Sequence, residues 1–153
     1  MFGIPYEEIT FQSDLDPSEI VARLGKVTAR FLWYKFPPKE KDFVGTIFSD
    51  GFRIFRNIRN RNTYLPFLLG RINENENGSL IVVTMTLHPI AVLIMAGLFL
   101  LTFRGLFISG GDAGAKLLPF AMITIFHLVM CLVGFNPEVS RAKKLLQEIF
   151  EIQ

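Results

Sequence analysis

The strongest chemical feature of the sequence is a run of basic side chains at Arg53, Arg56, Arg59 and Arg61. The surrounding stretch, residues 51–73, contains no acidic residue. Side chains alternate between the two faces of a strand, so Arg53, Arg59 and Arg61 could share one face. Arg56 would then lie on the opposite face. Because guanidinium groups bind phosphates and carboxylates through forked hydrogen bonds, we expect an anionic lipid, a nucleotide or an acidic protein here. A solvated basic face without a ligand is the alternative.

Side chains suited to bind a metal or a cofactor are sparse. His127 and Cys131 lie four residues apart, which places them on one face of a helix. A histidine from each chain of a dimer could ligate haem, whereas a neutral, hydrogen-bonded His127 is the simpler interpretation. A single cysteine cannot build a disulfide framework or a zinc knuckle. We therefore expect no metal site and no cofactor.

The sequence carries no catalytic signature. The loop at residues 110–116 resembles a phosphate-binding loop, but no glycine directly precedes Lys116 and no strand leads into the loop. No carboxylate pair stands out, and no serine has a nearby acid–base pattern. We therefore do not expect an enzyme. The net charge of +2 is too small to indicate a nucleic-acid partner.

Residues 1–88 predict an α+β domain, with an antiparallel meander sheet and one helix. Alternating apolar residues and turn signals predict strands at 9–12, 43–49, 52–58, 64–72 and 79–87. Asp50-Gly51 is a hairpin turn dipeptide between the second and third of these strands. Asp16-Pro17 is typical of a helix start, and the apolar face of that helix would comprise Ile20, Leu24, Val27 and Phe31.

Residues 89–135 predict a transmembrane hairpin of two helices. The apolar run 89–103 reaches about 22 Å as a helix, whereas the hydrocarbon core of a bilayer is about 30 Å thick. Extending the run through 104–108 gives about 30 Å, with Arg104 near one end of the span. The second run, 117–135, is long enough without help. Two buried helices in a soluble core are the alternative.

Residues 136–153 predict an amphipathic C-terminal helix, which Asn136-Pro137 would open. Its apolar face would comprise Val139, Ala142, Leu146 and Ile149. This helix could lie on the membrane surface or dock back onto the N-terminal domain. The first residues lack the features of a cleavable signal peptide. The basic residues that flank the two apolar runs favour an inner-membrane protein with both termini in the cytoplasm.

Four short stretches, FRIFR (52–56), RNTYLP (61–66), GRI (70–72) and TLHP (86–89), resemble a family of small uncharacterised bacterial membrane proteins. That family has an RNSFLP-like stretch, an LHP step into an apolar hairpin and a short charged C-terminal helix. Thr63-Tyr64 stands where Ser-Phe is more usual. The resemblance spans roughly residues 43–150 and implies a bacterial origin and a two-span topology. It implies no activity, so no functional residue is transferred from it.

Together these features predict a membrane-anchored cytoplasmic binding module, either a sensor or an accessory subunit, without catalytic activity. Its partners would be the lipid membrane, as an integral protein, and the anion bound by the arginines. The alternative is a ligand-gated, membrane-disrupting effector that forms a homo-oligomer through its hairpin. The small residues Ala96, Gly97 and Ala121 would permit close contact between helices in such an oligomer.

Overall fold

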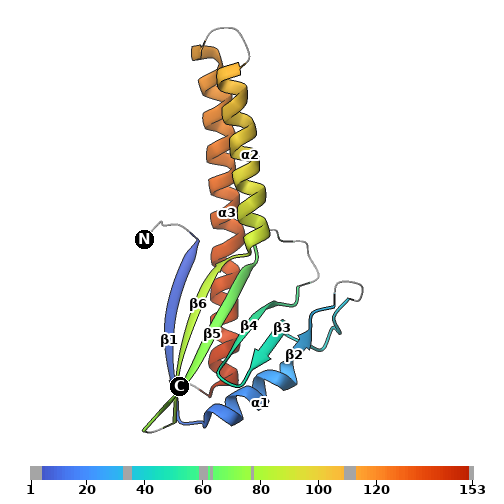
Figure 1. Cartoon of the computed structure of the whole chain (residues 1–153), viewed down its shortest axis with the longest axis vertical. Coiled ribbons are helices and arrows are strands. Elements are labelled where there is room, and N and C mark those ends of the chain that lie inside the picture. The colour runs from blue at the N-terminus through green and yellow to red at the C-terminus, as the bar shows by residue number, and fades with distance from the viewer. Residues whose placement is uncertain are drawn as a thin grey trace.

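The computed structural model describes residues 5–32, 36–58, 62, 64–76, 78–108 and 113–151, without the side chains at 105–108, 113–117, 119, 127, 130 and 131. Within these residues, six strands form one sheet and three helices accompany it (Figure 1). The strands are β1 (Tyr6–Ser13), β2 (Thr28–Arg30), β3 (Phe43–Phe48), β4 (Gly51–Arg56), β5 (Pro66–Asn75) and β6 (Gly78–Leu87). The helices are α1 (Pro17–Val27), α2 (Pro89–Ile108) and α3 (Ala113–Ile149).

The strands follow the order β1-β6-β5-β4-β3-β2 across the sheet. Neighbouring strands are antiparallel except β2 and β3, which are parallel. The α+β class predicted for residues 1–88 is confirmed, and the antiparallel meander is observed from β3 to β6, but the sheet is mixed because β2, which was not predicted, pairs in parallel with β3. A strand of three residues is too short to display an alternating pattern in the sequence. It follows α1 directly, so Phe31 does not continue the buried helix face and is exposed.

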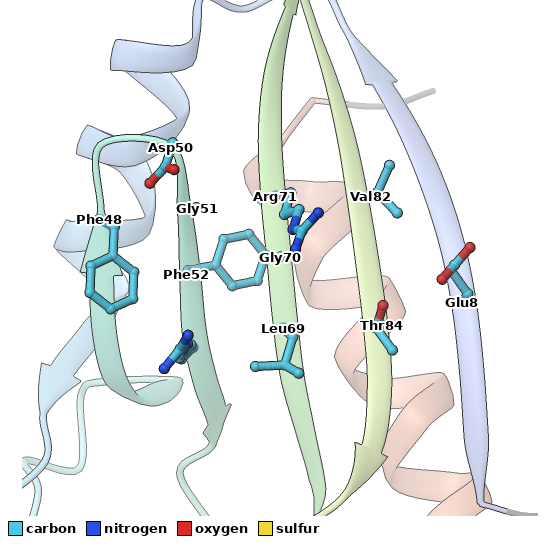
Figure 2. Close-up of a pocket in the computed structure, with 11 residues that line it drawn as sticks. Glu8, Phe48, Asp50, Gly51, Phe52, Leu69, Gly70, Arg71, Val82 and Thr84 are labelled. Carbon is cyan, nitrogen blue, oxygen red and sulfur yellow. The ribbon is translucent and has the colours of Figure 1, made fainter.

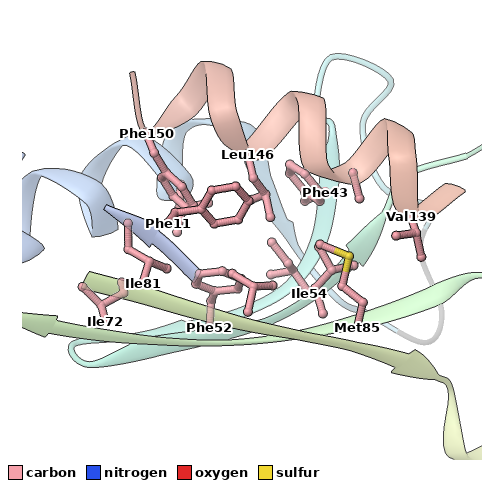
Figure 3. Packing of buried hydrophobic residues seen from close by; sticks show 14 of the residues in the cluster. Phe11, Phe43, Phe52, Ile54, Ile72, Ile81, Met85, Val139, Leu146 and Phe150 are labelled. Carbon is pink, nitrogen blue, oxygen red and sulfur yellow. The ribbon is translucent and has the colours of Figure 1, made fainter. Parts of the chain in front are cut away.

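One face of the sheet carries the hydrophobic core, which α1 and the C-terminal part of α3 cover (Figures 1 and 3). Alternate residues of β5 and β6 point into this core, as the alternation of their burial shows. The cluster includes Phe11, Ile20, Leu24, Phe43, Phe52, Ile54, Leu68, Ile81, Val83, Met85, Val139, Ala142, Leu146 and Phe150. The other face of the sheet carries no helix in the described part of the chain (Figure 1).

Phe52 packs sideways across the neighbouring strand because that strand has a glycine opposite it. Phe52 on β4 is paired with Gly70 on β5. A Cβ atom added at Gly70 would lie 2.1 Å from the Phe52 ring, far inside van der Waals contact. Figure 2 shows the ring directed at this position. Gly70 thus supplies the space that lets the large ring of Phe52 join the core.

Helix α3 is a single element of 37 residues and not the two helices expected from the sequence. It continues through Pro137, and its C-terminal part lies along the sheet (Figure 1). Val139, Ala142 and Leu146 are buried in the same core as the strands. Docking onto the domain, one of the two placements considered for residues 136–153, is therefore the one observed.

The predicted transmembrane hairpin is contradicted. In the part of the chain that the structure describes, no helix has the combination of length and apolar character needed to cross a membrane. Within α2, Arg104 ends a charge-free stretch of about 22 Å, which is shorter than the ~30 Å of a hydrocarbon core. Three further predictions rested on that hairpin and are contradicted with it. They are the inner-membrane localisation, the cytoplasmic placement of both termini and the membrane anchor.

Helices α2 and α3 pack against each other where they project beyond the end of the sheet (Figure 1). The ring of Phe120 on α3 contacts Phe99 and Phe103 on α2, at centroid distances of 5.6 and 6.4 Å. Many other large apolar side chains of the pair are exposed, including Leu93, Leu100, Leu101, Met122, Phe126 and Val133. The two helices thus make a limited contact with each other and leave most of their apolar surface uncovered.

Candidate functional site

The uncovered face of the sheet brings together two arginines from neighbouring strands. Arg53 on β4 points away from the core, between the buried residues Phe52 and Ile54. Arg71 on β5 points to the same side and is exposed. Arg71 is paired with Gly51, two residues from Arg53, so the two arginines are diagonal neighbours. Diagonal positions place their Cα atoms about 7–8 Å apart, close enough for both side chains to contact one small anion.

Neither arginine is neutralised by a carboxylate within the described residues, where all the ion pairs involve other side chains. The guanidinium carbon of Arg53 lies 5.7 Å from the centre of the Phe48 ring, within the range of a cation–π contact. This contact places the Arg53 guanidinium over an aromatic ring of the neighbouring strand. Both guanidinium groups therefore retain free hydrogen-bond donors.

The two arginines line a groove of about 680 Å³ on the uncovered face (Figure 2). Its remaining lining residues are Glu8, Phe48, Asp50, Gly51, Phe52, Leu69, Gly70, Val82 and Thr84. Two of these residues are carboxylates, Asp50 in the β3–β4 turn and Glu8 on β1. Strand β1 is two strands away from β5, which carries Arg71, so about 10 Å separates the two strands. We name this groove, with Arg53 and Arg71, the arginine groove.

Glu8 is already engaged by a neighbour on its own strand. The hydroxyl of Tyr6 donates a hydrogen bond to the Glu8 carboxylate at 3.0 Å. This bond raises the pKa of Tyr6 above its ordinary value. Glu8 is thus bonded to Tyr6 at the edge of the sheet, and none of the ion pairs among the described residues joins it to Arg53 or Arg71.

A second, more apolar groove of about 570 Å³ adjoins the arginine groove, and Arg53 lines both. We name it the aromatic groove, because four of its lining side chains are the rings of Phe31, Phe55, Phe67 and His88. Phe31 and Phe55 meet edge to face with 6.0 Å between ring centres, and Phe67 and His88 do so at 5.5 Å. This groove lies where the uncovered face of the sheet meets the start of α2.

Arg56, the second of the four predicted site arginines, lies apart from Arg53. Its side chain lies on the core side of β4 and forms an ion pair with Glu138 on α3. The Glu138 carboxylate is buried, with 8% of the side chain exposed, and also contacts Arg141 at 2.6 Å. The Arg56 Nε atom is buried and has no hydrogen-bond partner within the described residues. Arg56 therefore joins β4 to α3.

The other predicted site residues cannot be placed. Arg59 and Arg61 lie outside the described residues, and so do the side chains of His127 and Cys131. Within the part of the chain that is described, no cluster of three or more histidine, cysteine or acidic side chains could hold a metal ion. The candidate site therefore consists of Arg53 and of residues that the sequence did not single out.

Arg71 is the chief residue that the sequence interpretation missed as a ligand-binding candidate. The connection 57–65 separates its strand from that of Arg53, and this connection has no pattern that fixes how β5 pairs with β4. Only the observed register, with Arg71 opposite Gly51, shows that it is next to Arg53. The one usable signal was parity, since Arg71 lies between Gly70 and Ile72, both of which point into the core.

No family model, curated protein or solved structure matches the chain. The resemblance to small bacterial membrane proteins is therefore still a prediction, and the function has to be argued from the geometry of the uncovered sheet face.

Proposed function

We propose that the chain is a non-enzymatic binding module whose ligand is a small phosphorylated molecule, bound in the arginine groove by Arg53 and Arg71. The observation that carries this proposal is the juxtaposition of two unpaired guanidinium groups on the uncovered face of the sheet. Each guanidinium can donate two parallel hydrogen bonds to a phosphate, and such charge-assisted bonds are the strongest that side chains make. A pair of them fixes both the position and the orientation of an anion.

The size of the groove favours a small molecule over the other two anions that the arginine run suggested. Sites for small molecules are concave and typically enclose about 300–1,000 Å³, a range that includes the observed 680 Å³. An acidic protein or an anionic lipid surface would instead meet a broad area, and protein interfaces usually bury more than about 1,000 Å². A single phosphorylated molecule fits the concave shape and can reach both neighbouring guanidinium groups.

A binding role is also favoured by what surrounds the arginines. The lining residues of the arginine groove include no serine, cysteine or histidine, the side chains that most often act as a nucleophile or as a general base. The Thr84 hydroxyl and the two arginines are groups that bind and orient a phosphate. These side chains can hold an anion without transferring a proton or attacking a bond.

Replacement of Arg71 by glutamine tests the proposal. We expect Arg71→Gln to weaken the binding of pyrophosphate by about ten- to hundredfold, because charged hydrogen bonds contribute about 1.5–3 kcal/mol. The measurement is an isothermal titration of the full chain with pyrophosphate. The matched control is Lys144→Gln, which removes the same charge from an exposed position on α3 and should leave the affinity within about twofold. Wild-type affinity in folded Arg71→Gln, or no binding by the wild type, contradicts the proposal.

A further inference from the structure

We infer that the ligand is a nucleotide whose base occupies the aromatic groove while its phosphates occupy the arginine groove. This inference rests on the proposed function and specifies the class of phosphorylated molecule. It starts from the continuity of the two grooves, since Arg53 lines both of them. A ligand held by Arg53 at its phosphate end is therefore already at the entrance of the aromatic groove.

The spacing along the strands suits an elongated ligand. On β5, Phe67, Leu69 and Arg71 follow one another on the uncovered face, so the aromatic ring and the guanidinium are four residues apart. At about 3.3 Å per residue this separation is about 13 Å. On β4, Phe55 and Arg53 are two residues apart on the same face, or about 7 Å. These lengths are comparable with the distance between the base and the phosphates of a nucleoside diphosphate.

The aromatic groove offers planar rings for stacking. Phe55 and Phe67 come from neighbouring paired strands and are directly opposite each other in the register. Both are partly exposed, so a flat heterocycle can contact their rings. Every base has an aromatic face that stacks on such rings, whereas an inorganic phosphate or a sugar phosphate has none. The rings therefore add affinity only for a ligand that contains a base.

His88 adds a polar group at the side of this groove. Its Nδ1 atom accepts a hydrogen bond from the backbone N–H of Ile90 at 3.2 Å, at the start of α2. In the neutral ring the proton is then on Nε2, because one nitrogen accepts and the other donates. The ring is also held by its edge-to-face contact with Phe67. His88 therefore presents a fixed N–H donor that can bond a ring nitrogen or carbonyl of a base.

A comparison of two probes separates this inference from the proposed function. The full chain is titrated with pyrophosphate and with the diphosphates of adenosine, guanosine, cytidine and uridine. We expect at least one nucleoside diphosphate to bind tenfold or more tightly than pyrophosphate. Equal affinity for pyrophosphate and all four nucleotides would refute the inference while leaving the proposed function intact. Failure of every probe to bind would refute both.

Substitution of the rings then locates the base. Phe67→Leu keeps an apolar side chain and removes the ring, so the affinity for the nucleotide should fall roughly five- to hundredfold while that for pyrophosphate stays unchanged. Phe36→Leu is the matched control, because Phe36 is exposed outside both grooves, and it should change neither affinity. Phe55→Leu on β4 serves as a second test in case Phe67→Leu does not fold. If folded Phe67→Leu and Phe55→Leu bind the nucleotide as tightly as the wild type does, the base does not occupy the aromatic groove.

Discussion

Replacement of Phe150 by alanine is expected to lower the free energy of unfolding by about 3–5 kcal/mol, the range for truncation of a buried phenylalanine. The Phe150 ring is fully buried and meets the rings of Phe11 and Phe52, with 5.7 and 6.5 Å between ring centres. Its backbone carbonyl accepts a buried hydrogen bond from the Ser13 hydroxyl at 2.8 Å. Figure 3 shows Phe150 at the end of α3, above the sheet. The alanine variant would leave a cavity between α3 and two strands.

Chemical denaturation of the full chain measures this effect, and the exposed residue Phe36 supplies the control. Phe36 has 95% of its surface exposed, so Phe36→Ala should change the free energy of unfolding by less than about 0.5 kcal/mol. A loss below about 1 kcal/mol in Phe150→Ala would mean that the end of α3 does not close the core. The core would then depend on the strands and α1.

Replacement of Glu138 by alanine is expected to cost about 3 kcal/mol of stability. Removal of one member of a buried ion pair leaves the partner charge without compensation, and such changes usually cost about 3–5 kcal/mol. The lower end applies because Arg56 keeps 19% of its side chain exposed and can recover some hydration. Arg141 is largely exposed and loses less. The main cost is therefore the isolated charge of Arg56 between β4 and α3.

Two further variants test this account of Glu138. Glu148→Ala removes an exposed carboxylate from the same helix and should change stability by less than about 0.5 kcal/mol. In the double variant Arg56→Leu with Glu138→Leu, both charges are replaced by apolar groups, so most of the stability should return. If Glu138→Ala denatures at the same urea concentration as Glu148→Ala, the ion pair does not join α3 to the sheet.

Local signals predicted the parts of the fold that depend on neighbouring residues. The dipeptide Asp50-Gly51 correctly indicated the hairpin of β3 and β4, although the turn lies one residue earlier, at 49–50, and Gly51 already pairs with Phe48. The proline at the first position of α1 correctly marked its start. In both cases the residues that determine the structure are adjacent in the sequence. The alternation of buried and more exposed residues in β5 and β6 could be predicted for the same reason.

Features that depend on distant residues could not be predicted in this way. The parallel pairing of β2 with β3 requires the chain to return through residues 31–42, and the three residues of β2 give no alternating pattern. The start expected at Asn136-Pro137 was wrong because packing of α3 along the sheet stabilises a helix that continues through Pro137. Tertiary contacts of this kind override local propensity.

In the candidate site, too, features set by neighbouring residues could be predicted and contacts between distant residues could not. Arg53 was predicted correctly to face away from Phe52 and Ile54, because parity within one strand is a local property. Arg56 was likewise predicted correctly to lie on the opposite face, but its ion pair with Glu138, which is 82 residues away in the sequence, could not be predicted. The transmembrane prediction is contradicted, although α2 does continue through Arg104 to Ile108, because no helix in the described part of the chain is long and apolar enough to cross a membrane.

The central claim is that Arg53 and Arg71 together bind a phosphorylated ligand, and heteronuclear NMR of the arginine side chains tests it most directly. On titration with pyrophosphate, the Nε–H resonances of Arg53 and Arg71 should shift together and saturate at the same ligand concentration. Arg23, which is paired with Glu19 and Glu151, provides an internal reference that should not move. Saturable binding that leaves the resonances of Arg53 and Arg71 unchanged would contradict the account.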